Sequence, residues 1–334
     1  MKDSLFEHYQ LKVERSVQAF GYEAIIYRNI VYCIVPISKL EQEELYEMKL
    51  LSDYMIQKGD IRVGSILPTV EGNLSTMIND EEVVLIRCPV YTHRVSNTLG
   101  YELARFHKRG RSFPYQVNNL NRIGQWKFLW EKRLDQMEIF WKEKVRQHPD
   151  NRFETLFVEA FPYYIGLTEN AIQYLVDTEI DETPSPIDSA TICYHRFTEN
   201  SWDKDSYTKI PTEWVYDHYT RDLAEYIRDQ YTSGGNRKNG QIIHFLKEYE
   251  RVNTLSPFSW RLLYARLVFP LHFFECIEGY YMTESENKKE QQLQRLEAML
   301  THSSEHERFL ATFLANVGVN EKRLTIPNIN WLQI

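Results

Sequence analysis

The sequence predicts an α+β protein with two lobes, a small antiparallel β-rich lobe over residues 1–95 and a larger, mainly helical lobe over residues 96–334. Three observations support this prediction. Short β-prone runs are concentrated in the first part of the chain. Helix-period patterns dominate the rest, and one pair of short strand-like runs interrupts them. A length of 334 residues is consistent with about two domains.

The first lobe is predicted from strand and turn signals. Tyr22–Tyr27 and Ile30–Val35 are β-prone runs separated by Arg28 and Asn29, which predicts a hairpin. A helix is expected over Lys39–Ile56, because apolar residues recur there at helical spacing. The remaining strand candidates are Ser65–Thr69, Leu74–Ile78 and Val83–Cys88, with a turn at Asn79-Asp80 before the last.

The second lobe is predicted from helical periodicity. In its first helix Leu99, Leu103 and Phe106 share one face. Pro270 is expected to kink the helix that contains it. The predicted helices are Thr98–Lys108, Gln125–Gln147, Phe161–Asp177, Leu223–Gln230, Gln241–Glu250, Trp260–Tyr281, Gln291–Thr301 and Glu307–Asn316, and the strand-like pieces are Thr191–Tyr194 and Glu213–Val215.

Composition and charge argue against several classes of protein. A net charge of -8 disfavours a generic nucleic-acid binder, which usually has a basic surface. The N-terminal segment lacks the apolar stretch of a signal peptide, and no run approaches the roughly 18 apolar residues of a membrane span. The four cysteines are far apart, form no CxxC motif and indicate buried thiols in a reducing compartment; they are Cys33, Cys88, Cys193 and Cys276. We therefore expect a soluble protein that is synthesised in the cytoplasm.

Several local motifs resemble known families. Leu99–His107 resembles the G-x-x-L-A-x-x-H helix of aminoglycoside-phosphotransferase-like proteins. Pro68-Thr69, Gly72 and Val84-Leu85 resemble the N-lobe strands of spore coat kinase-like proteins. The most specific similarity is to the YutH branch of the CotS-type spore coat family, and it lies in the blocks Arg122–Lys127, Phe161–Leu167, Ile192–Phe197 and Trp214–His218. The resemblance extends over essentially the whole chain.

This resemblance implies a two-lobed fold of the protein-kinase and aminoglycoside-phosphotransferase type. It also implies a Bacillus-type sporulation context, a place in or near the spore coat, and other spore coat proteins as partners. A fold by itself does not establish an activity. Phosphoryl transfer requires that phosphates are held, that metal is positioned and that a base lies near the acceptor hydroxyl, so each of these positions can be compared in turn.

The positions that would hold nucleotide phosphates lack the expected residues. A glycine-rich loop is expected between the first two predicted strands, but Tyr27–Ile30 contains no glycine and Gly21 stands alone. The strand expected to carry a phosphate-binding lysine reads Tyr32–Pro36 and has none. Lys39 is the nearest substitute, but an exposed lysine at a helix start explains it better. Glu47 stands where a helix glutamate belongs and is expected to be a solvated helix residue.

The catalytic loop should read H-x-D-x-x-x-x-N, and the segment Cys193–Asn200 departs from that pattern. If the motif is aligned on Asn200, His195 occupies the position of the catalytic aspartate. If it is aligned on His195-Arg196, that position falls on Phe197 and the asparagine position falls on Trp202. Both alignments lose the carboxylate. A histidine can act as a base near neutral pH, but a packed or hydrogen-bonded role is the simpler interpretation.

The position of the metal-binding aspartate is also altered. Asp222-Leu223-Ala224 matches the helix that should follow it, and the expected aspartate position falls on Pro211 or Thr212. Glu213 or Asp217 could supply one metal contact instead. Asp222 itself is expected to cap its helix. Because Mg²⁺ requires hard oxygen ligands, we expect no metal site and no cofactor.

Two further patterns have ordinary explanations. His302–His306 matches H-x-x-E-H, but it lacks an obvious third zinc ligand and reads as a loop with a helix cap. The predicted helix Gln125–Gln147 interleaves aromatic, basic and acidic residues. Contact with nucleic acid is possible there, although an amphipathic helix docked on the helical lobe or on a partner explains the pattern better.

Three hypotheses about function remain open. The first is a non-catalytic, kinase-like spore coat protein that acts by binding other proteins, which the 22 tyrosines favour because tyrosine is enriched at interfaces. The second is an atypical ATP-dependent phosphotransferase of the aminoglycoside or choline kinase type that uses His195, Asn200 and Glu213. The third is a ligand-binding module that uses the cleft expected between the two lobes to bind a ligand without phosphates. We favour the first, with His195, Asn200, Glu213 and Asp217 as positions of a degenerate site.

Overall fold

The computed structural model describes residues 2–37, 40–89, 97–320 and 329. The chain divides into two compact units, which are described separately. The first unit contains residues 1–123, 189–233 and 244–254. The second contains residues 124–188, 234–243 and 255–334. The lobe boundary expected after residue 95 stays a prediction.

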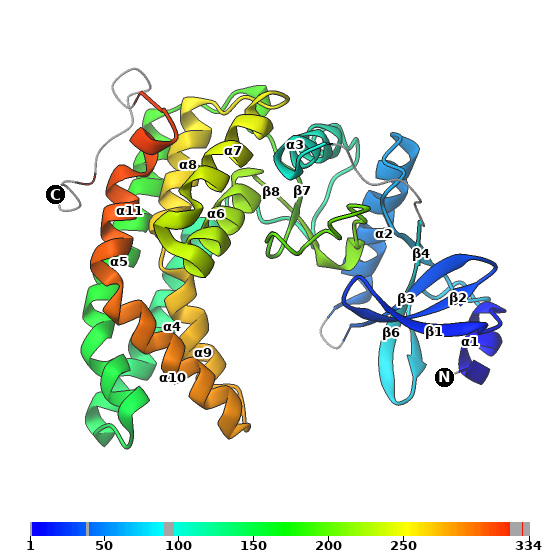
Figure 1. The fold of residues 1–334 in the computed structure, drawn as a ribbon, viewed down its shortest axis with the longest axis horizontal. Helices are drawn as coiled ribbons and strands as arrows, with labels where there is room; N and C mark the ends of the chain where they lie inside the picture. Colours follow the sequence, from blue (N-terminus) through cyan, green and yellow to red (C-terminus); the bar gives the residue numbers. More distant parts are fainter. Residues whose placement is uncertain (1, 38–39, 90–96, 321–328, 330–334) are drawn as a thin grey trace. The chain divides into compact units, whose positions relative to one another are not determined.

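An antiparallel sheet forms the β-rich part of the first unit (Figure 1). Its strand order is β1-β2-β3-β6-β4, and β5 also pairs with β6. The predicted strands are confirmed, whereas the first strand and the first helix were not predicted. The elements are α1 (Lys2–Tyr9), β1 (Arg15–Ala19), β2 (Tyr22–Tyr27), β3 (Ile30–Pro36), α2 (Gln42–Gln57), β4 (Ser65–Leu67), β5 (Thr76–Ile78) and β6 (Glu81–Cys88).

Two-residue turns join the hairpins of this sheet. Both residues have positive φ in each turn, which is the pattern of a type I′ turn and matches the twist of the flanking strands. The predicted turns at Arg28-Asn29 and Asn79-Asp80 are confirmed, with φ of 48° and 62° and of 51° and 63°. Phe20-Gly21, with φ of 55° and 85°, joins β1 to β2 in the same way.

Both faces of the sheet are buried. On one face Ile25, Ile34 and Leu85 form a core with Leu5 and Tyr9 of α1. On the other face Ala24, Cys33, Ile86 and Ile66 align across neighbouring strands and are fully shielded from solvent. Helix α2 contacts β4 and buries its apolar residues Leu45, Met48, Leu51 and Met55.

Helices and a two-stranded sheet complete the first unit. These are α3 (Leu99–Gly110), β7 (Thr191–Tyr194), β8 (Trp214–Asp217), most of α6 (Thr220–Gly234) and the second half of α7 (Asn239–Glu250). Thr98 caps α3, because its side chain accepts a hydrogen bond from the Tyr101 N–H. Gly100 lets α3 approach α7 closely, since a Cβ at this position would lie 2.2 Å from the Phe245 carbonyl oxygen.

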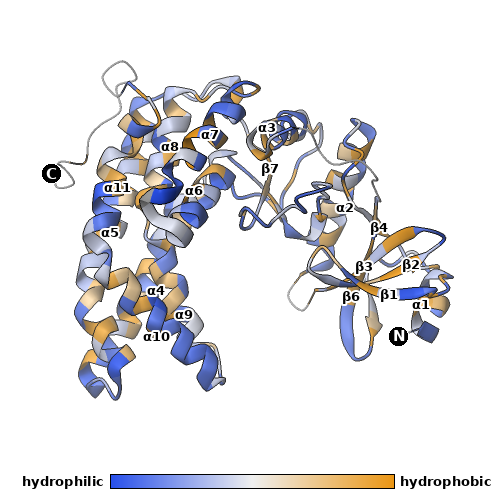
Figure 2. Cartoon of the chain, in the orientation of Figure 1, coloured by the Kyte–Doolittle hydropathy of each residue, from blue (hydrophilic) through white to orange (hydrophobic). Residues whose placement is uncertain are grey.

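The second unit is helical, with orange and blue residues side by side on its helices in Figure 2, as expected of amphipathic helices that bury one face. Stacked aromatic rings fill its core; Tyr164 and Phe273 lie 3.6 Å apart between centroids, and Trp130 and Phe269 lie 4.5 Å apart. The helices are α4 (Trp126–Gln147), α5 (Arg152–Asp181), α8 (Pro257–Val268), α9 (Leu271–Tyr281), α10 (Glu286–Thr301) and α11 (Ser303–Asn316).

The predicted helices are confirmed with shifted ends. The expected kink at Pro270 is a full break, because α8 ends at Val268 and α9 begins at Leu271. Helix α5 is 30 residues long and contains Pro162, so it extends well beyond the predicted segment. In α4, Trp126 and Trp130 are buried and so are unavailable to stack on nucleic-acid bases. Within the described residues, no helix has the length and apolarity needed to span a membrane.

Candidate functional site

The four candidate residues come from β8 and from the segment that joins β7 to β8. The His195 N–H donates a hydrogen bond to the Glu213 carbonyl oxygen over 2.9 Å, so these two residues are neighbours just beyond the β7–β8 ladder. Asn200 lies in the joining segment and is exposed. Asp217 lies at the opposite end of the ladder, paired with Thr191, and is fully buried. The structure therefore brings His195 and Glu213 together and places Asp217 elsewhere.

Asp217 has a structural set of partners. Its carboxylate accepts hydrogen bonds from the Arg221 guanidinium over 2.7 Å and from the His218 N–H over 2.7 Å. Arg221 also donates to the Tyr194 carbonyl oxygen over 3.1 Å. Asp217 thus holds Arg221 against the end of β7, and both carboxylate oxygens of Asp217 are used in hydrogen bonds within the first unit.

His195 has an electrostatic environment unlike that of a catalytic base. Burial, together with the repulsion of the charged form by Arg221, Arg122 and Arg196, lowers the pKa of its imidazole to about 4. The ring is therefore neutral at pH 7. A general base works best with a pKa near the operating pH, so a histidine with a pKa of about 4 is a weak proton acceptor.

Each of the three arginines near His195 already has partners within the first unit. Arg221 pairs with Asp217, and Arg196 pairs with Glu225 at 3.0 Å. Arg122 donates to the carbonyl oxygens of Asn119 and Asn121 over 2.8 and 2.9 Å. These partners hold the three guanidinium groups in place, and the charges of the arginines disfavour protonation of His195.

The Glu213 side chain is hydrogen-bonded to a residue of the β sheet. Its carboxylate accepts a hydrogen bond from the Tyr22 hydroxyl over 2.8 Å. Tyr22 is the first residue of β2 and follows the turn Phe20-Gly21. The loop between the first two strands is therefore this turn, and the prediction that placed it at Tyr27–Ile30 was wrong because β1 was missed. A two-residue turn with one glycine has too few backbone N–H groups to surround phosphates.

The lysine and glutamate positions also lack a kinase arrangement. Strand β3 contains Cys33 and Val35, both buried, and no lysine, whereas Lys39 lies outside the described residues. Glu47 was predicted to be solvated, and this is wrong because the residue is only 9% exposed. Its carboxylate accepts hydrogen bonds from the backbone N–H groups of residues 118, 119 and 120 over 2.8 to 3.0 Å.

Lys209 is a buried cation that the sequence did not single out. Its ammonium group lies 3.2 Å from an Asp60 carboxylate oxygen and 4.6 Å from the centre of the Trp202 ring. Burial lowers the pKa of Lys209, and the Asp60 carboxylate acts in the opposite direction. The backbone of Lys209 bonds to Arg62 and Gly64, so the loop after Asn200 is attached to the β sheet. No local pattern in its sequence marks this role.

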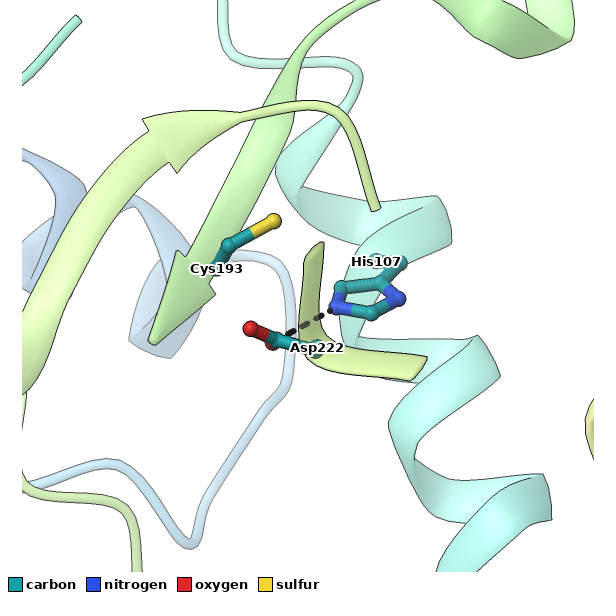
Figure 3. Close-up of side chains that lie close together, drawn as sticks. All are labelled: His107, Cys193 and Asp222. Atoms are coloured by element: carbon teal, nitrogen blue, oxygen red, sulfur yellow. Dashed lines mark hydrogen bonds and ion pairs between the residues drawn. The ribbon is translucent and has the colours of Figure 1, made fainter. Parts of the chain in front are cut away.

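Asp222 lies close to His107 and Cys193 (Figure 3), and it is central to a buried hydrogen-bond network. Its carboxylate accepts from the Tyr194 N–H over 2.9 Å and lies 3.1 Å from His107 Nε2. His107 Nδ1 lies 2.8 Å from the Tyr249 hydroxyl. Asp222 is therefore not the helix cap that was predicted, because it lies inside α6 and contacts a strand and another helix.

The network has donor types that could ligate a metal. The ligand atoms of His107, Cys193 and Asp222 lie within 4.8 Å of one another, and all three residues are buried. Yet the Asp222 and His107 contacts are already satisfied, and the Cys193 thiol lies 3.6 Å from two carbonyl oxygens, as a donor would. A metal would have to displace several of these bonds at once. The residues thus fit a structural hydrogen-bond network, and they do not fit a resident metal.

The H-x-x-E-H pattern covers the start of α11: His302 is the single residue between α10 and α11, and the other four residues form the first turn of α11, so the predicted loop is one residue long. His302 and Glu305 are exposed and lie 3.4 Å apart. The His306 ring packs instead against His272, with 5.1 Å between ring centres. Among the described residues, these histidines are not part of any cluster of potential metal ligands.

Comparison with known proteins identifies the family. Residues 2–313 match the family described as "Spore coat putative kinase YutH". The chain belongs to this family. It is 41% identical to the endospore coat-associated protein YutH of Bacillus subtilis (strain 168) over 334 residues, which covers 99% of this chain and 98% of that protein. The predicted family is confirmed, and the predicted spore coat location agrees with both descriptions.

Solved structures confirm the predicted fold. An aminoglycoside phosphotransferase from Alicyclobacillus acidocaldarius superposes with a TM-score of 0.68 at 14% identity, covering 95% of this chain and 96% of the other. A microcompartment-associated aminopropanol kinase superposes with a TM-score of 0.62 at 10% identity, covering 96% of this chain and 98% of the other. A spectinomycin phosphotransferase solved with ADP and spectinomycin gives 0.57 at 13% identity, covering 89% and 93%. At these identities the likeness establishes the fold alone.

The low pKa of His195 can be measured directly. An NMR titration of the imidazole should give a midpoint near 4, well below the ordinary 6.5. Protonation then favours the unfolded state, so the contribution of His195 to stability is complete above about pH 6.5 and is lost as the pH falls toward 4. Replacement His195→Gln should flatten this part of the stability profile. A midpoint near 7 would contradict the proposed environment and would make His195 a credible base.

Proposed function

We propose that this chain is a non-catalytic, kinase-like protein of the endospore coat that acts by binding other coat proteins. The observation that carries the proposal is the chemistry around His195. The position of the catalytic aspartate falls on His195 or on Phe197, neither of which has a carboxylate, and three nearby arginines help to keep His195 neutral. Its neighbour Glu213 is bound to Tyr22. His195 has no carboxylate to bind Mg²⁺, and the carboxylate of Glu213 already accepts a hydrogen bond.

Two further features support the same proposal. The phosphate-cradling loop is replaced by a two-residue turn at Phe20-Gly21. The helix glutamate Glu47 is occupied by backbone N–H groups, and β3 supplies no lysine for it. The loss affects phosphate binding, metal binding and proton transfer together, so a single compensating residue would not restore the reaction. The fold then serves as a scaffold whose surface contacts other proteins.

Binding of nucleotide separates this proposal from an atypical phosphotransferase. Thermal unfolding should be the same with and without millimolar ATP and Mg²⁺, and the protein should release no phosphate from ATP. The spectinomycin phosphotransferase that was crystallised with ADP provides a positive control for nucleotide binding in the thermal-unfolding assay. Stabilisation that requires Mg²⁺ together with ATP and disappears in His195→Gln would overturn the non-catalytic proposal and favour the phosphotransferase.

Binding of other coat proteins is tested separately. Immobilised full-length protein should retain coat polypeptides from a sporulating-cell extract, and cross-linking with mass spectrometry should map the contacts to defined surface residues. A heat-unfolded sample of the same protein serves as the control for non-specific adsorption. If the folded protein retains no coat polypeptide beyond that control, the binding role fails even when the nucleotide assays are negative.

A further inference from the structure

A pocket of about 520 Å³ lies in the first unit beside helices α2 and α3. Its lining includes Tyr54 and Lys58 near the end of α2, and Tyr101, Arg105, Lys108 and Arg109 on α3. His195 and Glu213 are not among the lining residues. The pocket is therefore separate from the degenerate site, and the proposed non-catalytic function does not depend on it.

The charge of this pocket is opposite to that of the chain. The whole sequence carries a net charge of -8, whereas the pocket is lined by four cationic side chains and, as far as the described residues go, by no acidic one. Two of these cations are compensated, because Arg105 pairs with Glu102 at 3.4 Å and Arg109 pairs with Asp60 at 3.1 Å.

The other two cations, Lys58 and Lys108, are exposed, and none of the described carboxylates forms an ion pair with either. Lys58 lies over the Tyr54 ring, with 5.5 Å between the ammonium nitrogen and the ring centre. The pocket thus holds two positive charges that the protein itself leaves uncompensated. Two such charges lining one pocket match a ligand that carries two negative charges.

Helices α2 and α3 hold the cationic side chains of the pocket in place. Positions 101, 105, 108 and 109 are spaced so that they share one face of α3, while Leu103, Phe106 and His107 bury the other face in the core. Cations in the last turn of a helix are favoured by its dipole, which accounts for part of the positive charge at Lys108 and Arg109. The dipole of α2 likewise favours Lys58 at its C-cap, whereas no dipole accounts for Arg105 in the middle of α3.

The pocket also has an aromatic wall. The guanidinium carbons of Arg105 and Arg251 each lie 6.0 Å from the centre of the Tyr101 ring, which is partly exposed. An aromatic ring flanked by cations can contact the flat body of a ligand while the cations bind its anionic group.

We propose that this pocket binds a phosphate monoester, with the dianionic phosphate between Lys58 and Lys108 and the body of the ligand against Tyr101. A phosphate monoester carries a charge of about -1.5 to -2 at neutral pH, which matches the two uncompensated lysines. The same group occurs on small organic phosphates and on phosphorylated protein side chains. The experiment therefore uses one probe of each kind.

Isothermal titration calorimetry on the full chain tests the proposal with phenyl phosphate as the first probe. Phenyl phosphate should bind, and phenyl sulfate, which carries one negative charge, should bind at least about tenfold more weakly. The double replacement Lys58→Gln and Lys108→Gln should weaken phenyl phosphate binding by about tenfold or more. The matched control, Lys132→Gln with Lys142→Gln on α4, changes the net charge equally and should leave binding unchanged.

The outcomes are distinct from those of the nucleotide assay, because phenyl phosphate binding should need no Mg²⁺ and should persist in His195→Gln. A phosphotyrosine peptide that binds more tightly than phenyl phosphate would support the proposal and assign the site to a phosphorylated protein. Weaker binding of the peptide would support it and assign the site to a small molecule. No binding of phenyl phosphate to the native protein, or equal loss in the control variant, would overturn it.

Discussion

Replacement Asp222→Ala should lower the free energy of unfolding by about 3 kcal/mol, because it removes two hydrogen bonds to a buried carboxylate. The Tyr194 N–H and His107 Nε2 would each lose a partner. Both positions are closed to solvent, so water cannot replace the lost acceptor at little cost. Urea unfolding followed by circular dichroism measures the change.

Two control variants test whether the loss of stability comes from the hydrogen bonds of Asp222. Asp222→Asn keeps the side-chain volume and an oxygen acceptor for the Tyr194 N–H, so its loss should be smaller, about 1 kcal/mol. Asp135→Ala removes an exposed carboxylate on α4 and should change the stability by less than about 0.5 kcal/mol. If Asp222→Ala unfolds at the same urea concentration as the native protein, the network is not a structural support.

Replacement Glu47→Ala should destabilise the protein by about 2 kcal/mol, because hydrogen bonds to a charged acceptor are among the stronger ones. The carboxylate binds three successive backbone N–H groups of residues 118–120, and of these the Leu120 N–H is buried. These bonds join α2 to the loop that follows α3. Their loss should also speed hydrogen exchange of these three amides.

An exposed neighbour provides the control for this prediction. Glu43→Ala lies on the same helix and changes the charge equally, and it should cost less than about 1 kcal/mol, with no effect on exchange of the loop amides. Equal effects of the two replacements would mean that Glu47 acts through the charge of α2. In an active kinase this glutamate would pair with a lysine, so unchanged behaviour toward nucleotides in Glu47→Ala is a further expected result.

Much of the fold could be predicted because its signals are local. The turns at Arg28-Asn29 and Asn79-Asp80 demand positive φ and were recognisable from residue type alone. The strand Arg15–Ala19 was missed because only one of its five residues is aliphatic and β-branched, and its burial is slight. It is an edge strand stabilised by pairing with β2, and pairing partners are not visible in local sequence.

For the candidate site, the sequence could predict only which expected residue types are missing. The absence of an aspartate at His195 or Phe197 and of a lysine on Tyr32–Pro36 is evident in the sequence. The contacts that are present could not be predicted, because Tyr22 and Glu213 are 191 residues apart and Lys209 and Asp60 are 149 apart. Contacts of this kind depend on how the chain folds back on itself.

The sequence by itself indicated the family and the order of most strands and helices, and it predicted a loss of residues for phosphoryl transfer, since residue identity and spacing suffice for these. The tertiary structure decided which charges are buried and what they touch. It turned Glu47 and Asp222 from expected surface and capping residues into buried acceptors, and it placed three arginines around His195. Burial and proximity set the pKa and the energy of an ionisable group, and both arise from residues distant in the chain.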